Sequence, residues 1–210
     1  MEINKDPCAK ACKPRGRPLS FDREQALEQA MHVFWRRGYE AASISELTAA
    51  MGITAPSLYT AFGDKERLFL EAIERYASGP GGGYMRALRE EPSAFLAIQR
   101  CLEESAEELT RPCHPKGCMM TMAATNCTEA SAHIQAALSK RRAEADEGMR
   151  CRIEQGITSG ELPAGTDAVA LSNFYVAVLR GMSMQAADGA SRETLMATAA
   201  AAMRAWPAPG

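Results

Sequence analysis

Residues 43–68 read SISELTAAMGITAPSLYTAFGDKERL, and this stretch decides the fold. Ser43 and Glu46 have the spacing of a capping box, in which each side chain satisfies a free backbone N–H at a helix start. Gly52 then suits a tight turn, and Thr54 offers the hydroxyl of an N-cap for a second short helix. The stretch therefore predicts two capped helices joined by a glycine turn, which is the plan of a helix-turn-helix.

The second helix of this pair has two chemically different sides. Leu58 and Phe62 lie on the side that is predicted to be buried, while Ala55, Ser57 and Thr60 lie on the opposite side. Small outward residues let a helix backbone come close to base edges in the major groove. Any helix pair in a helical protein can share this pattern, so the pattern alone leaves DNA binding and ordinary packing both open.

The rest of the chain also predicts helices. Aromatic residues make up only 6% of the 210 residues, and helix formers dominate while runs of β-branched residues are missing. We expect an all-α protein of about nine or ten helices, with a three-helix helix-turn-helix unit at the N-terminal end joined to a larger helical domain. The glycine-rich segment 78–83 is the clearest break. The predicted parts are a flexible basic arm (1–19), a helix-turn-helix domain that includes a connector helix at 64–78 (20–78), and a second helical domain (84–206).

Residues 16–76 resemble the DNA-binding domain of the tetracycline-repressor (TetR/AcrR) family. The resemblance implies a homodimeric transcription regulator, usually a repressor that a small molecule releases from a palindromic operator in double-stranded DNA. It also implies that the second domain binds the ligand and forms the dimer. The run 57–68 is the most specific part, because it joins the recognition helix to the start of the next helix. The matching segments are residues 16–18, 30–34, 38–39, 43–47, 51–53 and 57–68.

The same resemblance implies which residues contact DNA. Pro56 departs from the family pattern, because many relatives have Gly, Arg or Lys at this position. A helix with so few long polar side chains is expected to depend more on thymine methyl groups and on DNA shape. The expected contacts are Thr54, Ala55, Pro56, Ser57 and Thr60 to bases and sugar-phosphate, Tyr59 and Lys65 to phosphates, and Ser43 to the backbone from the preceding helix.

A basic arm precedes the first predicted helix and supplies local charge that the formal net charge of -2 hides. Affinity for DNA depends on the charge at the interface and not on the charge of the whole protein. Lys13, Arg15 and Arg17 are therefore predicted to reach phosphates or a minor groove. A short basic run is also typical of a solubilising tail.

By the same resemblance, the last two helices form the dimer interface. Both carry more apolar residues than one buried stripe needs, which packing across a two-fold axis would explain. Ordinary core helices are the alternative. The predicted interface residues are Val178, Met182, Leu195, Ala199, Met203 and Trp206.

The second domain is also expected to hold a pocket for an unknown small-molecule effector. A short apolar helix predicted over residues 117–126 is rich in methionine, whose side chain repacks around irregular ligands. A methionine stripe at helical spacing is also typical of a plain core. The predicted lining residues are Phe95, Cys118, Met119, Met122, Thr125, Asn126, Phe174 and Tyr175.

Seven cysteines, an odd number, favour free thiols in a reducing compartment. Cys113, Cys118 and Cys127 leave a thiol-based redox regulator open, whereas their spacing fits no strong metal template. We expect no secretion signal, membrane span, enzyme site, cofactor or metal, and therefore a cytoplasmic protein. A ligand-binding module without DNA binding is the remaining alternative.

Overall fold

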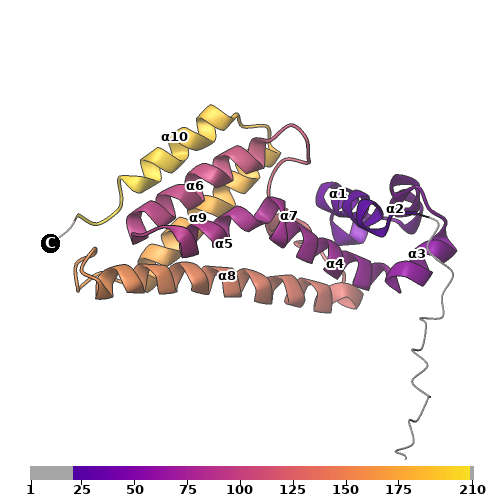
Figure 1. The fold of residues 1–210 in the computed structure, drawn as a ribbon, viewed down its shortest axis with the longest axis horizontal. Helices are drawn as coiled ribbons and strands as arrows, with labels where there is room; N and C mark the ends of the chain where they lie inside the picture. The colour runs from indigo at the N-terminus through magenta and orange to yellow at the C-terminus, as the bar shows by residue number, and fades with distance from the viewer. Residues whose placement is uncertain (1–20, 209–210) are drawn as a thin grey trace, which may run out of the picture.

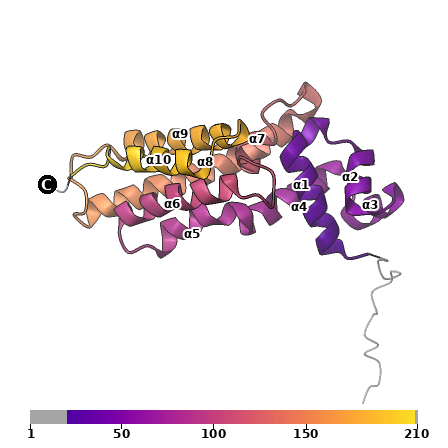
Figure 2. The same cartoon turned by 90° about the horizontal axis from the view of Figure 1, so that it is seen from above.

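The computed structural model describes residues 21–208. Within this range the chain forms ten α-helices, two short 3-10 helices and no strand, which confirms the predicted all-α fold. Figures 1 and 2 show an elongated molecule with α1–α3 at one end and α4 leading from them toward the other helices. The elements are α1 Arg23–Ala41, α2 Ile44–Met51, α3 Ala55–Phe62, α4 Lys65–Ser78, η1 Pro80–Gly82, α5 Gly83–Glu90, α6 Ala94–Thr110, α7 Met119–Met122, η2 Glu129–Ser131, α8 Ala132–Thr158, α9 Ala168–Ala187 and α10 Arg192–Met203.

Side-chain caps start each helix of the head, the name used here for α1–α4. Asp22 caps α1, Thr54 caps α3 and Asp64 caps α4, each through a side-chain oxygen that accepts backbone N–H bonds. Ser43 and Glu46 form both bonds of the predicted capping box at the start of α2. These local bonds satisfy helix-end N–H groups, and they are the reason that the helix starts follow from the sequence.

Gly38 interrupts α1 three residues before the helix ends. Its φ of 74° and ψ of 174° lie in a region that glycine alone occupies freely. One further turn follows Gly38 and carries the chain to Ala41. The break turns the Tyr39 N–H out of the helix, where it donates a 2.7 Å hydrogen bond to the carbonyl oxygen of Ala123.

The glycine-rich segment 78–83 is not a loop between the two parts. It forms η1 and the first residue of α5, a helix that the sequence did not predict. A Cβ added to Gly81 would lie 2.4 Å from the ring of Tyr76, so glycine lets the chain pass close to this ring. The predicted break is therefore a tightly packed helical turn.

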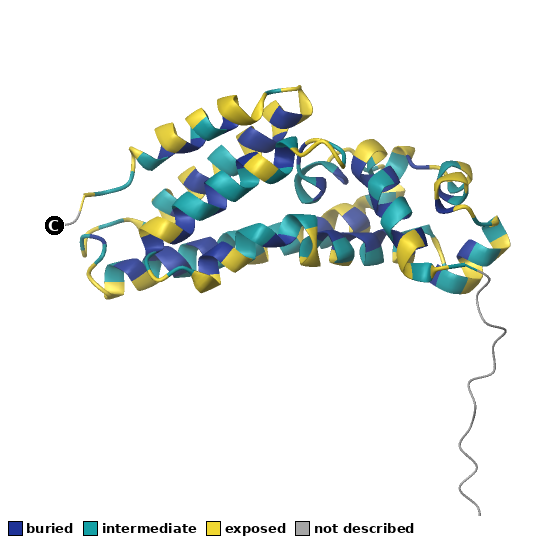
Figure 3. Cartoon of the chain, turned by 45° about the horizontal axis from the view of Figure 1, so that its top comes forward, coloured by how far each residue is buried: buried dark blue, intermediate teal, exposed yellow. Residues whose placement is uncertain are grey.

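The body, the name used here for α5–α10, is organised around α6, which contacts α5, α8, α9 and α10. Its core includes Ile98 and Leu102 of α6, Ile153 of α8, Tyr175 of α9 and Leu195 of α10. Burial of these apolar side chains is the main favourable term in holding the helices together. Figure 3 shows buried residues mainly where helices face one another and exposed residues on the outer faces.

The body also completes the core of the head. Met119, Ala123 and Ala124, together with Ile134 and Leu138 near the start of α8, belong to the same buried cluster as the apolar residues of α1–α4. The helix predicted over residues 117–126 is a single turn, α7, and the short η2 precedes the long helix α8. Residues 118–138 therefore belong to the body by chain order and to the head by packing.

Candidate DNA interface and ligand cavity

Helix α3 presents the side that the sequence predicted to face outward. Pro56, Tyr59 and Thr60 are exposed, Ala55 and Ser57 are half-buried, and the opposite residues Leu58 and Phe62 are in the core. Tyr59 keeps 49% of its surface exposed, which is unusual for a large ring on a helix of eight residues. An exposed helix with small side chains and one long aromatic hydroxyl can enter a major groove and reach a phosphate.

Hydroxyl groups at the N-terminal end of α3 are ordered within the helix. The Thr54 and Ser57 side-chain oxygens lie 2.9 Å apart, and Thr60 donates a 2.8 Å bond to the carbonyl oxygen of Pro56. Ser43, the cap of α2, is also exposed. The helix N-terminus favours negative charge, and these hydroxyls have lone pairs and protons left for bases or phosphates.

The side chain of Lys65, the first residue of α4, packs against the C-terminal end of α1 rather than extending into solvent. Its ammonium group donates to the carbonyl oxygen of Glu40 at 3.3 Å and lies 4.6 Å from the centre of the Tyr39 ring. Partial burial lowers the pKa of Lys65. Arg36 and Arg37 are exposed on the same helix end. The predicted arm residues Lys13, Arg15 and Arg17 lie outside the described residues.

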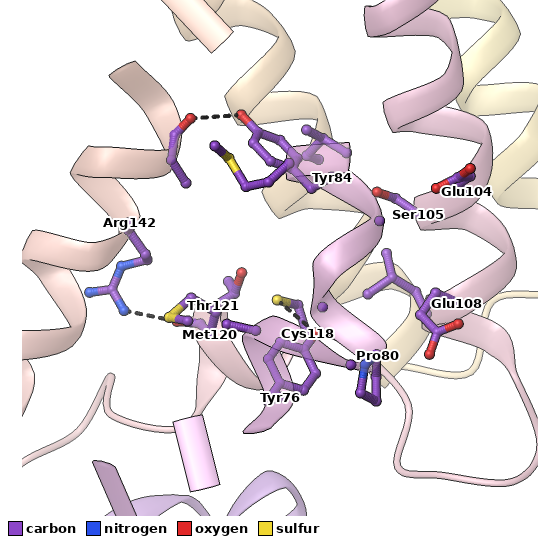
Figure 4. Close-up of a pocket in the computed structure, with 18 of the residues that line it drawn as sticks. Tyr76, Pro80, Tyr84, Glu104, Ser105, Glu108, Cys118, Met120, Thr121 and Arg142 are labelled. Carbon is purple, nitrogen blue, oxygen red and sulfur yellow. Dashed lines mark hydrogen bonds between the residues drawn. The ribbon is translucent and has the colours of Figure 1, made fainter. Parts of the chain in front are cut away.

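A cavity of about 1000 Å³ lies between the head and the body. Its walls come from α1, α4, η1, α5, α6, the segment 111–121, α8 and α9. Figure 4 shows Arg142 on one wall, Glu104, Ser105 and Glu108 on another, and Cys118 between them. The volume is at the upper end of the range for small-molecule sites, roughly 300–1000 Å³, and a space between bundle helices is a common place for one.

Of the eight residues predicted to line a pocket, Cys118 lines this cavity. Met119 is fully buried in the core of the head, because α7 makes only one turn and directs it away from the space. Phe95 and Tyr175 pack against Trp206, while Phe174 is exposed on α9. The residues that the structure does not place in the cavity wall are Phe95, Met119, Met122, Thr125, Asn126, Phe174 and Tyr175.

Two side chains of the wall, Tyr76 and Cys118, are hydrogen-bonded to each other. Burial raises the pKa of Tyr76 well above its usual range, so its hydroxyl stays protonated and donates to the Cys118 sulfur at 3.3 Å. Cys113, which is exposed, also lines the cavity. Among residues 21–208, no group of three or more His, Cys, Asp or Glu side chains is arranged to hold a metal ion.

The predicted dimer residues divide into two groups. Met182, Leu195 and Ala199 are buried within one chain, where they fill the space between α9, α10 and α6. Val178, Met203 and Trp206 are partly buried and pack against the same core. The large apolar side chains that α9 exposes are Val169, Phe174 and Met184.

The wall residues Tyr84 and Arg142 were not predicted. A tyrosine next to a glycine run and an arginine in a charged helix carry no local signal, since only the packing of distant segments brings them to one space. The described residues contain no helix that is both long enough and apolar enough to cross a membrane.

Comparison with known proteins agrees with the two-part structure. Residues 26–72 match the family described as bacterial regulatory proteins, tetR family, and residues 97–205 match a tetracyclin repressor-like C-terminal domain. The repressor ComR of Escherichia coli is 36% identical over 208 residues, which cover 99% of this chain and 98% of ComR. The repressor BdcR of the same organism is 30% identical over 189 residues, or 89% of this chain and 90% of BdcR.

A solved structure shows the same arrangement with DNA bound. A cysteine mutant of the TetR family regulator CifR, complexed with 26 bp of double-strand operator DNA, is 44% identical with a TM-score of 0.88, and the match covers 91% of this chain and 100% of CifR. The matches span both the head and the body, so the likeness is not confined to a shared helix-turn-helix. This chain therefore belongs to the tetR family of bacterial regulatory proteins and is a helix-turn-helix transcriptional regulator.

Proposed function

We propose that this protein is a cytoplasmic homodimeric repressor that leaves a palindromic operator when a small molecule fills the cavity, and that it acts by binding and not by catalysis. The observation that carries the proposal is the direct connection between the two sites. The segment 117–123, which contributes Cys118, Met120 and Thr121 to the cavity wall, accepts hydrogen bonds from Trp35 and Tyr39 of α1 at its two ends. A ligand that changes this wall can therefore change the position of α3.

For the DNA contacts, we propose that α3 enters the major groove and the flanking residues hold the phosphates. Tyr59 has the exposure and reach for a phosphate oxygen, and Lys65 needs only to leave the Glu40 carbonyl oxygen to do the same. The proposed contacts are those that the sequence predicted: Ser43, Thr54, Ala55, Pro56, Ser57, Tyr59, Thr60 and Lys65, with Lys13, Arg15 and Arg17 from the arm.

The test is a gel shift with DNA flanking the gene, followed by anisotropy titrations over a range of salt. Lys65→Met is expected to lower the slope of log K against log salt by about 0.9, because one phosphate contact is lost. Lys140→Met, on the exposed side of α8, is the matched control and keeps the wild-type slope. A folded dimer that shifts no specific DNA would refute the proposal.

We also propose that the exposed apolar side of α9 forms the dimer. Phe174 is 40% exposed there, and a dimer would set two recognition helices about 34–36 Å apart, as a palindrome requires. Phe174→Glu is expected to give a monomer in sedimentation experiments. Leu96→Glu, at a residue of α6 with 42% exposure, is the matched control that stays dimeric. Equal behaviour of the two variants would exclude this surface.

Thiol sensing is a second candidate function, favoured by the presence of Cys113 and Cys118 in the wall of one cavity. Both can react with a molecule that enters this space, because neither is fully buried. Hydrogen peroxide is then expected to release the wild-type protein from its operator and to leave the double variant Cys113→Ser, Cys118→Ser bound. If the double variant is released as well, the thiol hypothesis fails.

A further inference from the structure

The charged residues around the cavity are almost all paired. Glu104 contacts Arg100 at 2.6 Å, Glu107 contacts Arg192 at 2.5 Å and Asp146 contacts Arg180 at 2.5 Å. Glu108 accepts from both Arg111 and His114, and Glu28 pairs with Arg75. Only Glu144 among the lining carboxylates has no ion pair within residues 21–208, and it is exposed to solvent.

Arg142 differs from the neighbouring arginines of the wall. Arg141 pairs with Glu74, and Arg180 pairs with Asp146, but within residues 21–208 Arg142 forms no ion pair with a carboxylate. Its guanidinium group donates one hydrogen bond, to the carbonyl oxygen of Met120 at 3.0 Å. Burial lowers the pKa of Arg142 and the nearby charge of Arg180 lowers it further, while the carboxylate of Asp146, which is paired to Arg180, raises it. A guanidinium group stays protonated in proteins, so this positive charge has no carboxylate in direct contact with it.

The remaining wall is suited to an apolar body. Tyr76, Met85, Leu109, Val176 and Leu179 line it with aromatic rings, a thioether and branched side chains. The Tyr84 hydroxyl is already bonded to the carbonyl oxygen of Ala145 at 3.2 Å. An occupant can therefore bury apolar surface over most of its length while one end meets Arg142 (Figure 4).

We propose that the effector is an organic monocarboxylate, with its carboxylate paired to Arg142 and its apolar body along the tyrosine and methionine side of the cavity. Arg86, the other lining arginine without an ion pair within residues 21–208, is exposed to solvent. Arg142 is therefore the partly buried guanidinium group left to balance a charge in the described lining, which favours a monoanion over a phosphate dianion. A cation finds no partly buried carboxylate left free among the described lining residues. The inference rests on the proposed function only for the statement that this ligand is the effector; the binding site itself does not depend on it.

The same guanidinium group connects the ligand to the head. A carboxylate on Arg142 competes with the Met120 carbonyl oxygen for its N–H groups, and a bond to an ionised acceptor is the stronger of the two. Release of Met120 frees α7, whose next residue Ala123 accepts the Tyr39 N–H of α1. Occupancy of the cavity thus changes a contact of the head through two consecutive hydrogen bonds.

The experiment compares carboxylates with neutral amides of the same shape. The probes are decanoate against decanamide and cinnamate against cinnamamide, with phenyl phosphate as the dianion, measured by calorimetry on the full-length protein. The wild type is expected to bind at least one carboxylate, and Arg142→Met to bind it about 10- to 100-fold more weakly, the effect of one charge-assisted bond. Arg142→Lys, which keeps the charge, is expected to recover part of the loss. Lys140→Met, which removes an exposed charge on α8 outside the cavity wall, stays within about 3-fold of the wild type.

Three results would overturn the inference: no carboxylate binds, an amide binds as tightly as its acid, or Arg142→Met binds the acid like the wild type. Tighter binding of phenyl phosphate than of both carboxylates would overturn the assignment to a monocarboxylate. Failure of the proposed function can be told apart from failure of this inference. If an amide releases the operator, the protein is still a ligand-responsive repressor, but Arg142 is not its anion site. If a carboxylate binds at Arg142 and no operator is bound in any state, the site stands and the repressor function fails.

Discussion

Replacement of Gly38 by alanine tests whether the break in α1 is required for the contact between the head and α7. At a φ of 74° and a ψ of 174°, an alanine is strained by roughly 1–3 kcal/mol. Its Cβ would also lie 3.1 Å from the Ala123 carbonyl oxygen, the same atom that accepts the Tyr39 N–H. Loss or distortion of that bond adds about 1 kcal/mol. Gly38→Ala is therefore expected to lower the free energy of unfolding by about 2–4 kcal/mol.

Gly52→Ala is the matched control. Gly52 has a φ of 67° and a ψ of 29°, the left-handed helical region, and no atom lies within 4 Å of an added Cβ. The expected loss is about 1 kcal/mol, from backbone conformation alone. Urea unfolding at a fixed protein concentration, followed by circular dichroism and by the fluorescence of Trp35 and Trp206, measures both variants. Equal losses in the two variants would show that contact with Ala123 contributes nothing, and would refute the assigned role of the break.

Two further predictions concern the head. Ser43→Ala removes the Oγ that accepts the Glu46 backbone N–H and is expected to lower the free energy of unfolding in urea by about 1 kcal/mol, whereas Ser45→Ala, two residues later and exposed, changes it by less than about 0.5 kcal/mol. Hydrogen bonds from the backbone and side chain of Thr128 lower the pKa of Glu40 from 4.5. This carboxylate therefore stabilises the fold above its unfolded pKa, and the stabilisation is lost as the pH falls through the lower folded value. Glu40→Gln should be less stable than the wild type at pH 7, with the difference shrinking in unfolding curves taken below pH 4.5; a constant difference would contradict this account.

The features predicted well from the sequence are those that short-range chemistry determines. The start of α2 at Ser43 and of α3 at Thr54 depends on side chains that bond to backbone within three residues. The outward side of α3 follows from helical periodicity around Leu58 and Phe62. The family resemblance then supplied the DNA-binding function, which the pattern alone did not decide.

The features that were missed depend on contacts between distant segments. Helix α5 begins in a glycine run that locally favours a turn, and just before it Gly81 of η1 packs closely against Tyr76 of α4. The predicted interface residues Met182 and Leu195 were chosen because they exceed one apolar stripe, and they are buried within one chain. Periodicity does not say which apolar side of a helix its own chain covers. The cavity wall is assembled from eight segments, so no local pattern could point to Arg142.

The packing of residues 118–138 onto α1 and α4 also limits how such a regulator can be re-engineered. A chimera that joins a foreign sensor to this DNA reader at the glycine-rich segment would leave behind Met119, Ala123, Ile134 and Leu138, which complete the core of the head. The transplanted reader would then expose part of its apolar surface and lose the acceptor for the Tyr39 N–H. A working chimera therefore has to include residues 118–138 together with the head. The ligand response is thus best changed by exchanging the part of the body far from the head, while the stretch from Cys118 to Leu138 keeps its native sequence.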